Sequence, residues 1–236
     1  MGNFALKWEK FVHAMIDNGG YRTVLLGLRN TVLVAVVGLI IGIAIGTILA
    51  AVEVMPKYKR LPRVLNKICQ LYVAFFRGTP LVVQLLVGYF VLRPLLGLKI
   101  SALVSCMIIY GMNSGAYVSE IMRSGIQSVD PGQMEAGRAV GLGYWTVMQK
   151  IVIPQAVKNI LPTLGNEFIA LIKDTSIVSF VGTTDLYVAF KFIGTNNYEF
   201  MVPYLVMALI YIVMVALISL GIKCMERSLK KSDRRK

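Results

Sequence analysis

Long apolar runs separated by short charged segments make up most of the chain, and this pattern predicts helices that cross a membrane. Residues 30–52 carry no charged side chain and are numerous enough for one helix to span a bilayer. Further apolar runs occupy 68–92, 100–122, 159–180 and 201–222. We therefore predict an all-α integral membrane protein with five transmembrane helices.

The run at 159–180 is the least clear of the five because it contains a proline together with Glu167, Lys173 and Asp174. We include it as a span because the basic C-terminal tail and the basic segment before the run would otherwise fall on opposite sides of the membrane. Hydropathy alone does not identify this span.

Basic residues gather in three segments of the chain. Sixteen of the 25 lysines and arginines lie in 57–67, in 123–158 and in the tail from Lys223. Cytoplasmic loops of membrane proteins collect positive charge, so we expect these segments in the cytoplasm, the N-terminus outside and the C-terminus inside. This distribution accounts for the net charge of +13, and we expect no nucleic-acid partner.

Composition agrees with a membrane protein. Hydrophobic residues make up 56% of the chain and charged residues only 16%, whereas a soluble domain carries about a quarter charged residues.

The N-terminal segment has an amphipathic pattern of its own. Trp8, Phe11 and Met15 recur at roughly helical spacing, which predicts an interfacial or extracytoplasmic helix within 1–22.

Three glycines share one face of the first predicted span. Gly38, Gly42 and Gly46 are spaced by four residues. Glycine is common in membrane helices for no special reason, but this spacing favours close contact with another helix.

The polar segment that begins at Asp130 has its own folding signals. Asp130 is a favoured N-cap, Pro131 suits the first helical position, and Gln133 stands where a capping-box partner belongs. Gly141 is the residue type that most often ends a helix. The sequence predicts a short helix over about 131–140.

This segment resembles the EAA signature of the permease subunits of bacterial ABC importers. The matching residues are Glu135, Ala136, Gly141, Ile151 and Pro154. The chain departs from the signature at Gly137, where alanine is usual, and at Ile153, where leucine is usual. Both are small changes that affect helix packing.

A second motif lies in the second predicted span, where Arg77, Gly78, Thr79 and Pro80 follow one another. An arginine inside a membrane is expected to face protein or water, and a proline loosens the helix that contains it. The motif, with the leucine, valine and glutamine that follow it, resembles the polar amino acid branch of the permease family.

The resemblance implies a type I ABC importer transmembrane domain over 23–227, with a coupling loop at 123–158 and a cytoplasmic basic tail at 228–236. It implies a bacterial cytoplasmic membrane protein that pairs with a second permease subunit, identical or different. It also implies two ATPase subunits that hold ATP and Mg²⁺, and an extracytoplasmic solute-binding protein that delivers a polar amino acid. The implied coupling residues are Glu135, Ala136, Gly137, Gly141, Ile151 and Pro154.

Polar residues on the third and fourth spans are candidates for the substrate path. Tyr110, Asn113, Ser114 and Tyr117 form one stripe along the third span, which equally suits hydrogen bonding between helices. The fourth span places Thr163, Glu167 and Asp174 on one face. A carboxylate there suits a substrate amino group, or pairs with a basic residue that holds the helices together. The candidate substrate residues are Asn113, Ser114, Glu167 and Asp174, with Lys173 or Arg77 available to a substrate carboxylate.

Signatures of enzymes are missing from the sequence. It has no Gly-x-Ser-x-Gly, His-Glu-x-x-His, paired-cysteine or Walker A pattern and only one histidine. We therefore expect a transport subunit that is not an enzyme, with no metal site or cofactor of its own. A small channel or a structural membrane subunit without ATP coupling is the alternative.

Overall fold

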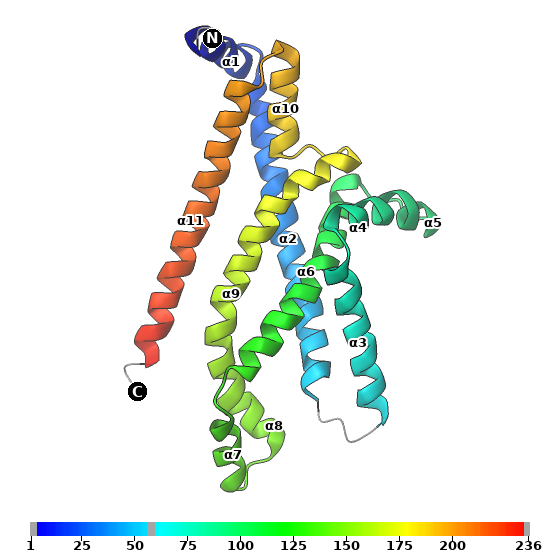
Figure 1. The fold of residues 1–236 in the computed structure, drawn as a ribbon, viewed down its shortest axis with the longest axis vertical. Coiled ribbons are helices and arrows are strands. Elements are labelled where there is room, and N and C mark those ends of the chain that lie inside the picture. The colour runs from blue at the N-terminus through cyan, green and yellow to red at the C-terminus, as the bar shows by residue number, and fades with distance from the viewer. Residues whose placement is uncertain (1–3, 56–59, 234–236) are drawn as a thin grey trace. The chain divides into compact units, whose positions relative to one another are not determined.

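A computed structural model describes residues 4–55 and 60–233, with side chains through residue 229. Lys57 and Lys59 of the basic segment and residues 234–236 of the tail lie outside this part of the chain. The regular secondary structure of the described part is all helical (Figure 1). Its helices are α1 Phe4–Ile16, α2 Gly20–Val54, α3 Arg60–Gly78, α4 Leu81–Val87, η1 Gly88–Leu92, α5 Arg93–Leu95, α6 Ala102–Gln127, α7 Pro131–Ala139, α8 Tyr144–Val147, η2 Met148–Val152, α9 Ile153–Asp174, η3 Thr175–Val181, α10 Leu186–Asn197 and α11 Met201–Asp233.

Three described helices, α2, α6 and α11, are long and apolar enough to cross a membrane by themselves, and two bent pairs of helices raise the number to as many as five. These five segments overlap the five predicted runs. The helices extend beyond the predicted bounds: α2 begins at Gly20, and α11 continues through Asp233 into the predicted tail.

The second predicted span is not one straight helix. Its two parts, Arg60–Gly78 and Leu81–Leu95, are bent by 105° relative to each other. Pro80 has no backbone N–H, and a proline disfavours helical backbone at the residue before it. The Thr79 hydroxyl donates to the Phe75 carbonyl at 2.8 Å. The prediction of a local loosening at Pro80 understated this break.

The fourth span is also broken. α9 begins at Ile153, six residues before the predicted start, and passes through Pro162 before it tightens into the 3₁₀ turn η3. The chain then turns at Gly182, whose φ is +73°, and Asp185 caps α10 by accepting from the backbone N–H groups of Tyr187 and Val188. The polar segment after this turn therefore contains α10, a helix of three turns.

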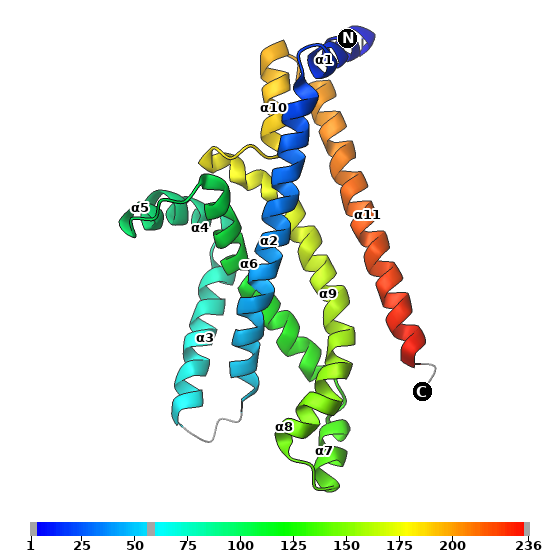
Figure 2. The same ribbon diagram turned by 180° about the vertical axis from the view of Figure 1, so that it is seen from behind.

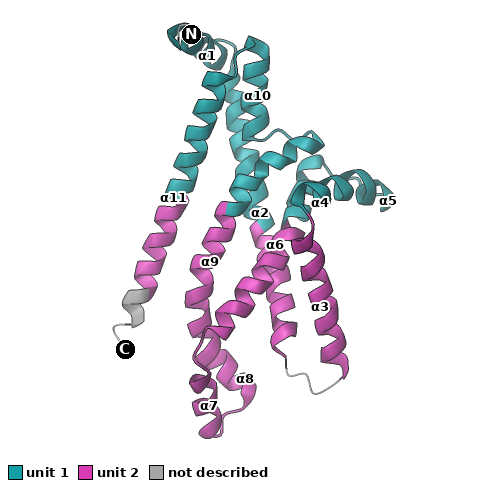
Figure 3. Ribbon diagram, viewed as in Figure 1, with its two compact units in different colours: residues 1–38, 80–110, 170–217 teal, residues 39–79, 111–169, 218–236 magenta. Residues whose placement is uncertain are grey.

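The chain divides into two compact units (Figure 3). Unit 1 comprises 1–38, 80–110 and 170–217, and unit 2 comprises 39–79, 111–169 and 218–236. Each is described separately below.

In unit 1, α1 packs against α10, and both views place these helices side by side (Figures 1 and 2). Phe11 of α1 is buried with Phe190 and Ile193 of α10. Lys7 forms a salt bridge with Glu199 at 3.0 Å, and its hydrogen bond holds the pKa of that carboxyl below its usual value. The predicted N-terminal helix is confirmed, and its apolar face packs on protein.

In unit 2, glycines bring α2 and α6 into close contact. A Cβ added at Gly46 would lie 2.6 Å from the Val118 side chain, and one at Gly42 would lie 2.7 Å from the Ser114 hydroxyl. On the facing helix, a Cβ at Gly111 would lie 2.5 Å from Ile41. Small residues of each helix therefore receive larger ones of the other, which confirms the predicted close contact for Gly42 and Gly46.

We predict that Gly46→Ala destabilises the protein by about 1–3 kcal/mol, because the new methyl group overpacks the α2–α6 contact. The measurement is the thermal unfolding midpoint in detergent. Gly221→Ala is the matched control, since a Cβ at Gly221 of α11 meets nothing within 4 Å. Equal midpoints for the two variants would show that the contact contributes little.

Candidate functional site

The segment from Asp130 to Gly141 folds as its sequence predicts. The Asp130 carboxylate accepts from the Gly132 N–H at 2.8 Å and caps α7, whose first residue is Pro131. Gly141 follows the helix with a φ of +86°, a conformation that other residues adopt only with strain. The capping-box partner differs, since the Gln133 side-chain oxygen accepts from Gln155 at 3.4 Å.

A small apolar core fixes this short helix to the rest of unit 2. Val147, Met148 and Val152 are buried, and Met134 of α7 packs against them. The Tyr144 hydroxyl donates to the Val54 carbonyl at 3.1 Å and so ties α8 to the end of α2. The α7 helix is therefore held on a packed support formed by α8 and η2.

A polar cleft of about 440 Å³ opens between α3, α6 and α9 within unit 2. Its lining includes Arg77 of α3, Tyr117 and Glu120 of α6, and Thr163 and Glu167 of α9. The cleft therefore brings together charged groups of both signs from three helices, which is unusual among apolar spans.

Two contacts hold the polar face of α6 beside this cleft. The Ser114 hydroxyl donates to the Glu167 carboxylate at 2.9 Å. The Asn113 amide donates to the Phe76 carbonyl at 3.4 Å, in the turn before Arg77. The polar stripe thus makes the interhelical hydrogen bonds that the sequence left as an alternative.

A chain of charges borders the cleft. The Glu120 carboxylate accepts from Arg123 at 2.6 Å and lies 3.7 Å from the Arg77 guanidinium, which also stands over the Tyr117 ring at 5.5 Å. Arg123 in turn lies 3.8 Å from the largely buried carboxylate of Glu53 on α2. These charges are paired, which reduces the free-energy cost of placing them between apolar helices.

A family model described as the binding-protein-dependent transport system inner membrane component matches residues 42–231. The chain belongs to this family. Its members are transport subunits rather than enzymes, and their helical fold is that of type I ABC importer permeases.

Individual relatives and a solved structure agree with this family. The chain is 38% identical over 203 residues to a putative glutamine transport system permease protein of Rickettsia bellii, which covers 86% of the chain and 91% of the relative. It is 38% identical over 210 residues to the arginine transport system permease protein ArtQ of Bacillus subtilis, with coverage of 89% and 94%. A crystal structure of an amino acid ABC transporter with histidines matches at a TM-score of 0.82 and 36% identity, over 91% of this chain and 97% of that one.

Within this family member, the predicted coupling residues divide into two groups. Glu135, Ala136, Gly141 and Pro154 are exposed, as a docking surface requires. Gly137 is buried, and a Cβ there would lie 2.7 Å from the Val147 side chain. Ile151, the remaining residue of the set, packs on the same core. The chain's own packing therefore requires a small residue at position 137.

Two exposed apolar residues of this segment were not singled out by the sequence analysis. Val140 is 77% exposed and Leu142 is 38% exposed, although both are apolar. They flank the turn at Gly141. The signal was present in the sequence, because two branched aliphatic side chains stand beside a helix-ending glycine in a polar loop.

The predicted substrate set is only partly brought together. Asn113, Ser114 and Glu167 belong to unit 2, where Glu167 lines the cleft. Asp174 belongs to unit 1, is exposed and is absent from the cleft lining. Asp174 shares a helical face with Glu167 but is not part of the cleft, because α9 continues for two turns beyond Glu167.

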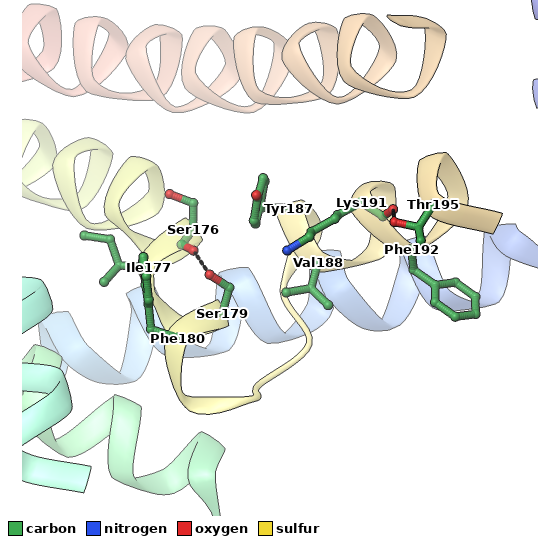
Figure 4. A pocket seen from close by; sticks show the side chains of 9 residues that line it. All are labelled: Ser176, Ile177, Ser179, Phe180, Tyr187, Val188, Lys191, Phe192 and Thr195. Carbon is green, nitrogen blue, oxygen red and sulfur yellow. Dashed lines mark hydrogen bonds between the residues drawn. The ribbon is translucent and has the colours of Figure 1, made fainter. Parts of the chain in front are cut away.

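A second cleft of about 680 Å³ lies within unit 1, between η3 and α10 (Figure 4). Its polar lining includes Ser176, Ser179, Lys191 and Thr195. Ser179 donates to the Ser176 carbonyl at 2.8 Å, and Lys191 stands over the Tyr187 ring at 6.0 Å.

Proposed function

We propose that this chain is the permease subunit of an ABC importer that carries a polar amino acid across the bacterial cytoplasmic membrane. Separate ATPase subunits, which hold ATP and Mg²⁺, supply the energy by docking on α7 and the turn that follows it. The observation that carries the proposal is the supported α7 helix with the exposed side chains of Glu135, Val140 and Leu142.

A polar amino acid suits the relatives and the cleft. The names of the relatives specify glutamine and arginine, and the solved transporter was crystallised with histidines. The cleft lining offers the carboxylate of Glu167 to a substrate amino group and the guanidinium of Arg77 to a substrate carboxylate. Because Glu120 is already paired with Arg123 and Arg77, the Glu167 carboxylate decides the preference, and a zwitterionic or cationic amino acid fits better than an acidic one.

Glu167→Gln is expected to weaken uptake of the amino acid by about tenfold to a hundredfold, because hydrogen bonds to charged groups contribute about 1.5–3 kcal/mol. The measurement is the concentration dependence of uptake by the reconstituted transporter, together with its preference among amino acids. Glu226→Gln on α11 is the matched control, since Glu226 lies outside the cleft. Expression and basal ATP hydrolysis must match the parent protein. Unchanged uptake kinetics and preference would exclude Glu167 as a ligand.

The coupling role is tested at Gly141. Gly141→Asp places a side chain where φ is +86°, at a cost of about 1–3 kcal/mol, and adds a negative charge at the docking turn. We expect normal insertion into the membrane but loss of the co-purified ATPase subunit, with transport and substrate-stimulated ATP hydrolysis falling together.

The matched control is Gly97→Asp. Gly97 also has a positive φ, of +64°, and has nothing within 4 Å of an added Cβ. It lies outside the α7 segment, so capture of the ATPase should be unchanged. If Gly141→Asp still captures the ATPase and transports normally, α7 is not the contact.

The alternative function is a channel or structural subunit without ATP coupling. It predicts that no ATPase co-purifies with the parent chain. Neighbouring reading frames for a Walker A ATPase and a secreted solute-binding protein would favour the importer. The same proposal includes a second permease subunit, for which α11 offers a long apolar helix with no buried residue in its spanning window.

The proposed topology has the N-terminus outside and the C-terminus in the cytoplasm. A reporter fused after Lys236 should be active only in the cytoplasm, and one inserted near Thr195 of α10 only outside. The fusion after Lys236 is also the control for expression of the full chain. A cytoplasmic signal at Thr195 would mean that α9 and η3 do not cross the membrane.

A further inference from the structure

The cleft between η3 and α10 in unit 1 plays no part in the function proposed above (Figure 4). Its volume of about 680 Å³ falls within the range of about 300–1,000 Å³ that small-molecule pockets occupy. Lys191 is the one charged side chain among its described lining residues. Figure 4 shows this side chain extending from α10 toward η3, so its ammonium group faces the cleft.

The positive charge of Lys191 has no acidic partner in the described part of the chain. None of the salt bridges there includes Lys191, whose nitrogen lies 6.0 Å from the centre of the Tyr187 ring. An adjoining cleft of about 500 Å³ shares Ser176 and Tyr187 and is lined by Lys173. Neither described lining includes an aspartate or a glutamate, and Asp174 lies outside both. The two clefts therefore present positive charge to an occupant.

The hydroxyl groups of the cleft are available as acceptors. The Ser176 hydroxyl donates to the Lys173 carbonyl at 3.4 Å, and the Ser179 hydroxyl donates to the Ser176 carbonyl at 2.8 Å. The Thr195 hydroxyl donates to the Lys191 carbonyl at 2.9 Å. Each hydroxyl has one hydrogen, so its oxygen keeps lone pairs for a donor in the cleft. One cationic group beside several acceptor oxygens is the complement of a zwitterion.

We propose that this cleft is a second amino acid site, in which the Lys191 ammonium binds the substrate carboxylate and the hydroxyl oxygens accept from the substrate ammonium group. A charged lysine on a candidate span faces water or protein, so a dissolved amino acid fits the cleft better than a lipid tail. The substrate class rests on the proposed function, whose topology places α10 outside, where the amino acid arrives. Lys173 in the adjoining cleft adds to the attraction of the carboxylate.

Acylation of Lys191 by a water-soluble, amine-reactive ester tests the proposal, because it reports on this lysine alone. The complex purified through the full chain is placed in nanodiscs of phosphatidylcholine, without solute-binding protein or ATP. Mass spectrometry then gives the acylation rate of each lysine. Histidine or glutamine at about ten times its dissociation constant should slow acylation of Lys191 about tenfold, since only about one site in eleven is then free. Lys99 is exposed, lines neither cleft and is the internal control.

Analogues and variants identify the groups that bind. Histamine and 4-aminobutanamide lack the carboxylate and should not protect Lys191. Val188→Phe fills the cleft from α10 and should remove the protection, whereas Val83→Phe, at an exposed position of α4, is the matched control. Lys173→Gln should raise the half-protecting concentration by up to about fivefold, since a nearby exposed charge contributes little more. Lys10→Gln on α1 should leave it unchanged.

Unchanged acylation of Lys191 up to the solubility limit of each amino acid would overturn the proposal, as would equal protection by histamine. Slow acylation of Lys191 before any amino acid is added would assign the cleft to a partner subunit. Protection that appears only when phosphatidylglycerol is in the nanodiscs would assign it to a lipid phosphate, and the proposal fails in both cases. The measurement needs neither ATP nor transport. Failure here leaves the importer function standing, and protection of Lys191 in a chain that captures no ATPase leaves the amino acid site standing.

Discussion

The constraint on which this structure depends is that polar groups among apolar helices must find partners inside the protein. Lipid offers no hydrogen bonds, so an unpaired group costs several kcal/mol. Here the Ser114 hydroxyl meets the Glu167 carboxylate, and the Tyr110 hydroxyl donates to the Asp174 carbonyl at 2.6 Å. Each pair joins α6 to α9. Ser114 and Glu167, which we propose for the substrate path, are thus also groups that hold the helices in place.

Because these side chains also join the helices, the glycines that set the helix spacing affect the position of the polar groups. Gly42 faces Ser114 so closely that a Cβ would lie 2.7 Å from its hydroxyl oxygen. The backbone of α2 therefore fixes the position of Ser114, and Ser114 in turn contacts Glu167. Close helix packing is not only a source of stability here, because it also sets where the cleft carboxylate lies.

Local signals made the apolar helical segments, the α7 helix and the α2–α6 contact predictable, since capping residues, glycine spacing and apolar runs act within one segment. The 105° bend at Pro80 was not predictable in size, because the hydropathy of residues 68–92 is continuous across it. The position of Asp174 was not predictable either, since helical spacing gives a shared face but not where the cleft ends. The burial of Gly137 was not predictable, because a buried small residue and an exposed one have the same sequence signal.

One helix connects the two sites of the proposed function. α9 carries Pro154 of the coupling motif in its first turn and Glu167 of the cleft 13 residues later, a rise of about 20 Å. Between them lies Pro162, which cannot donate a backbone hydrogen bond, so the backbone of α9 is weakened at this position. A displacement of the α7 support reaches the cleft along this helix without crossing any loop. In the proposed importer, the same helix therefore carries a residue of the ATPase-docking motif near one end and the Glu167 carboxylate of the substrate cleft further along.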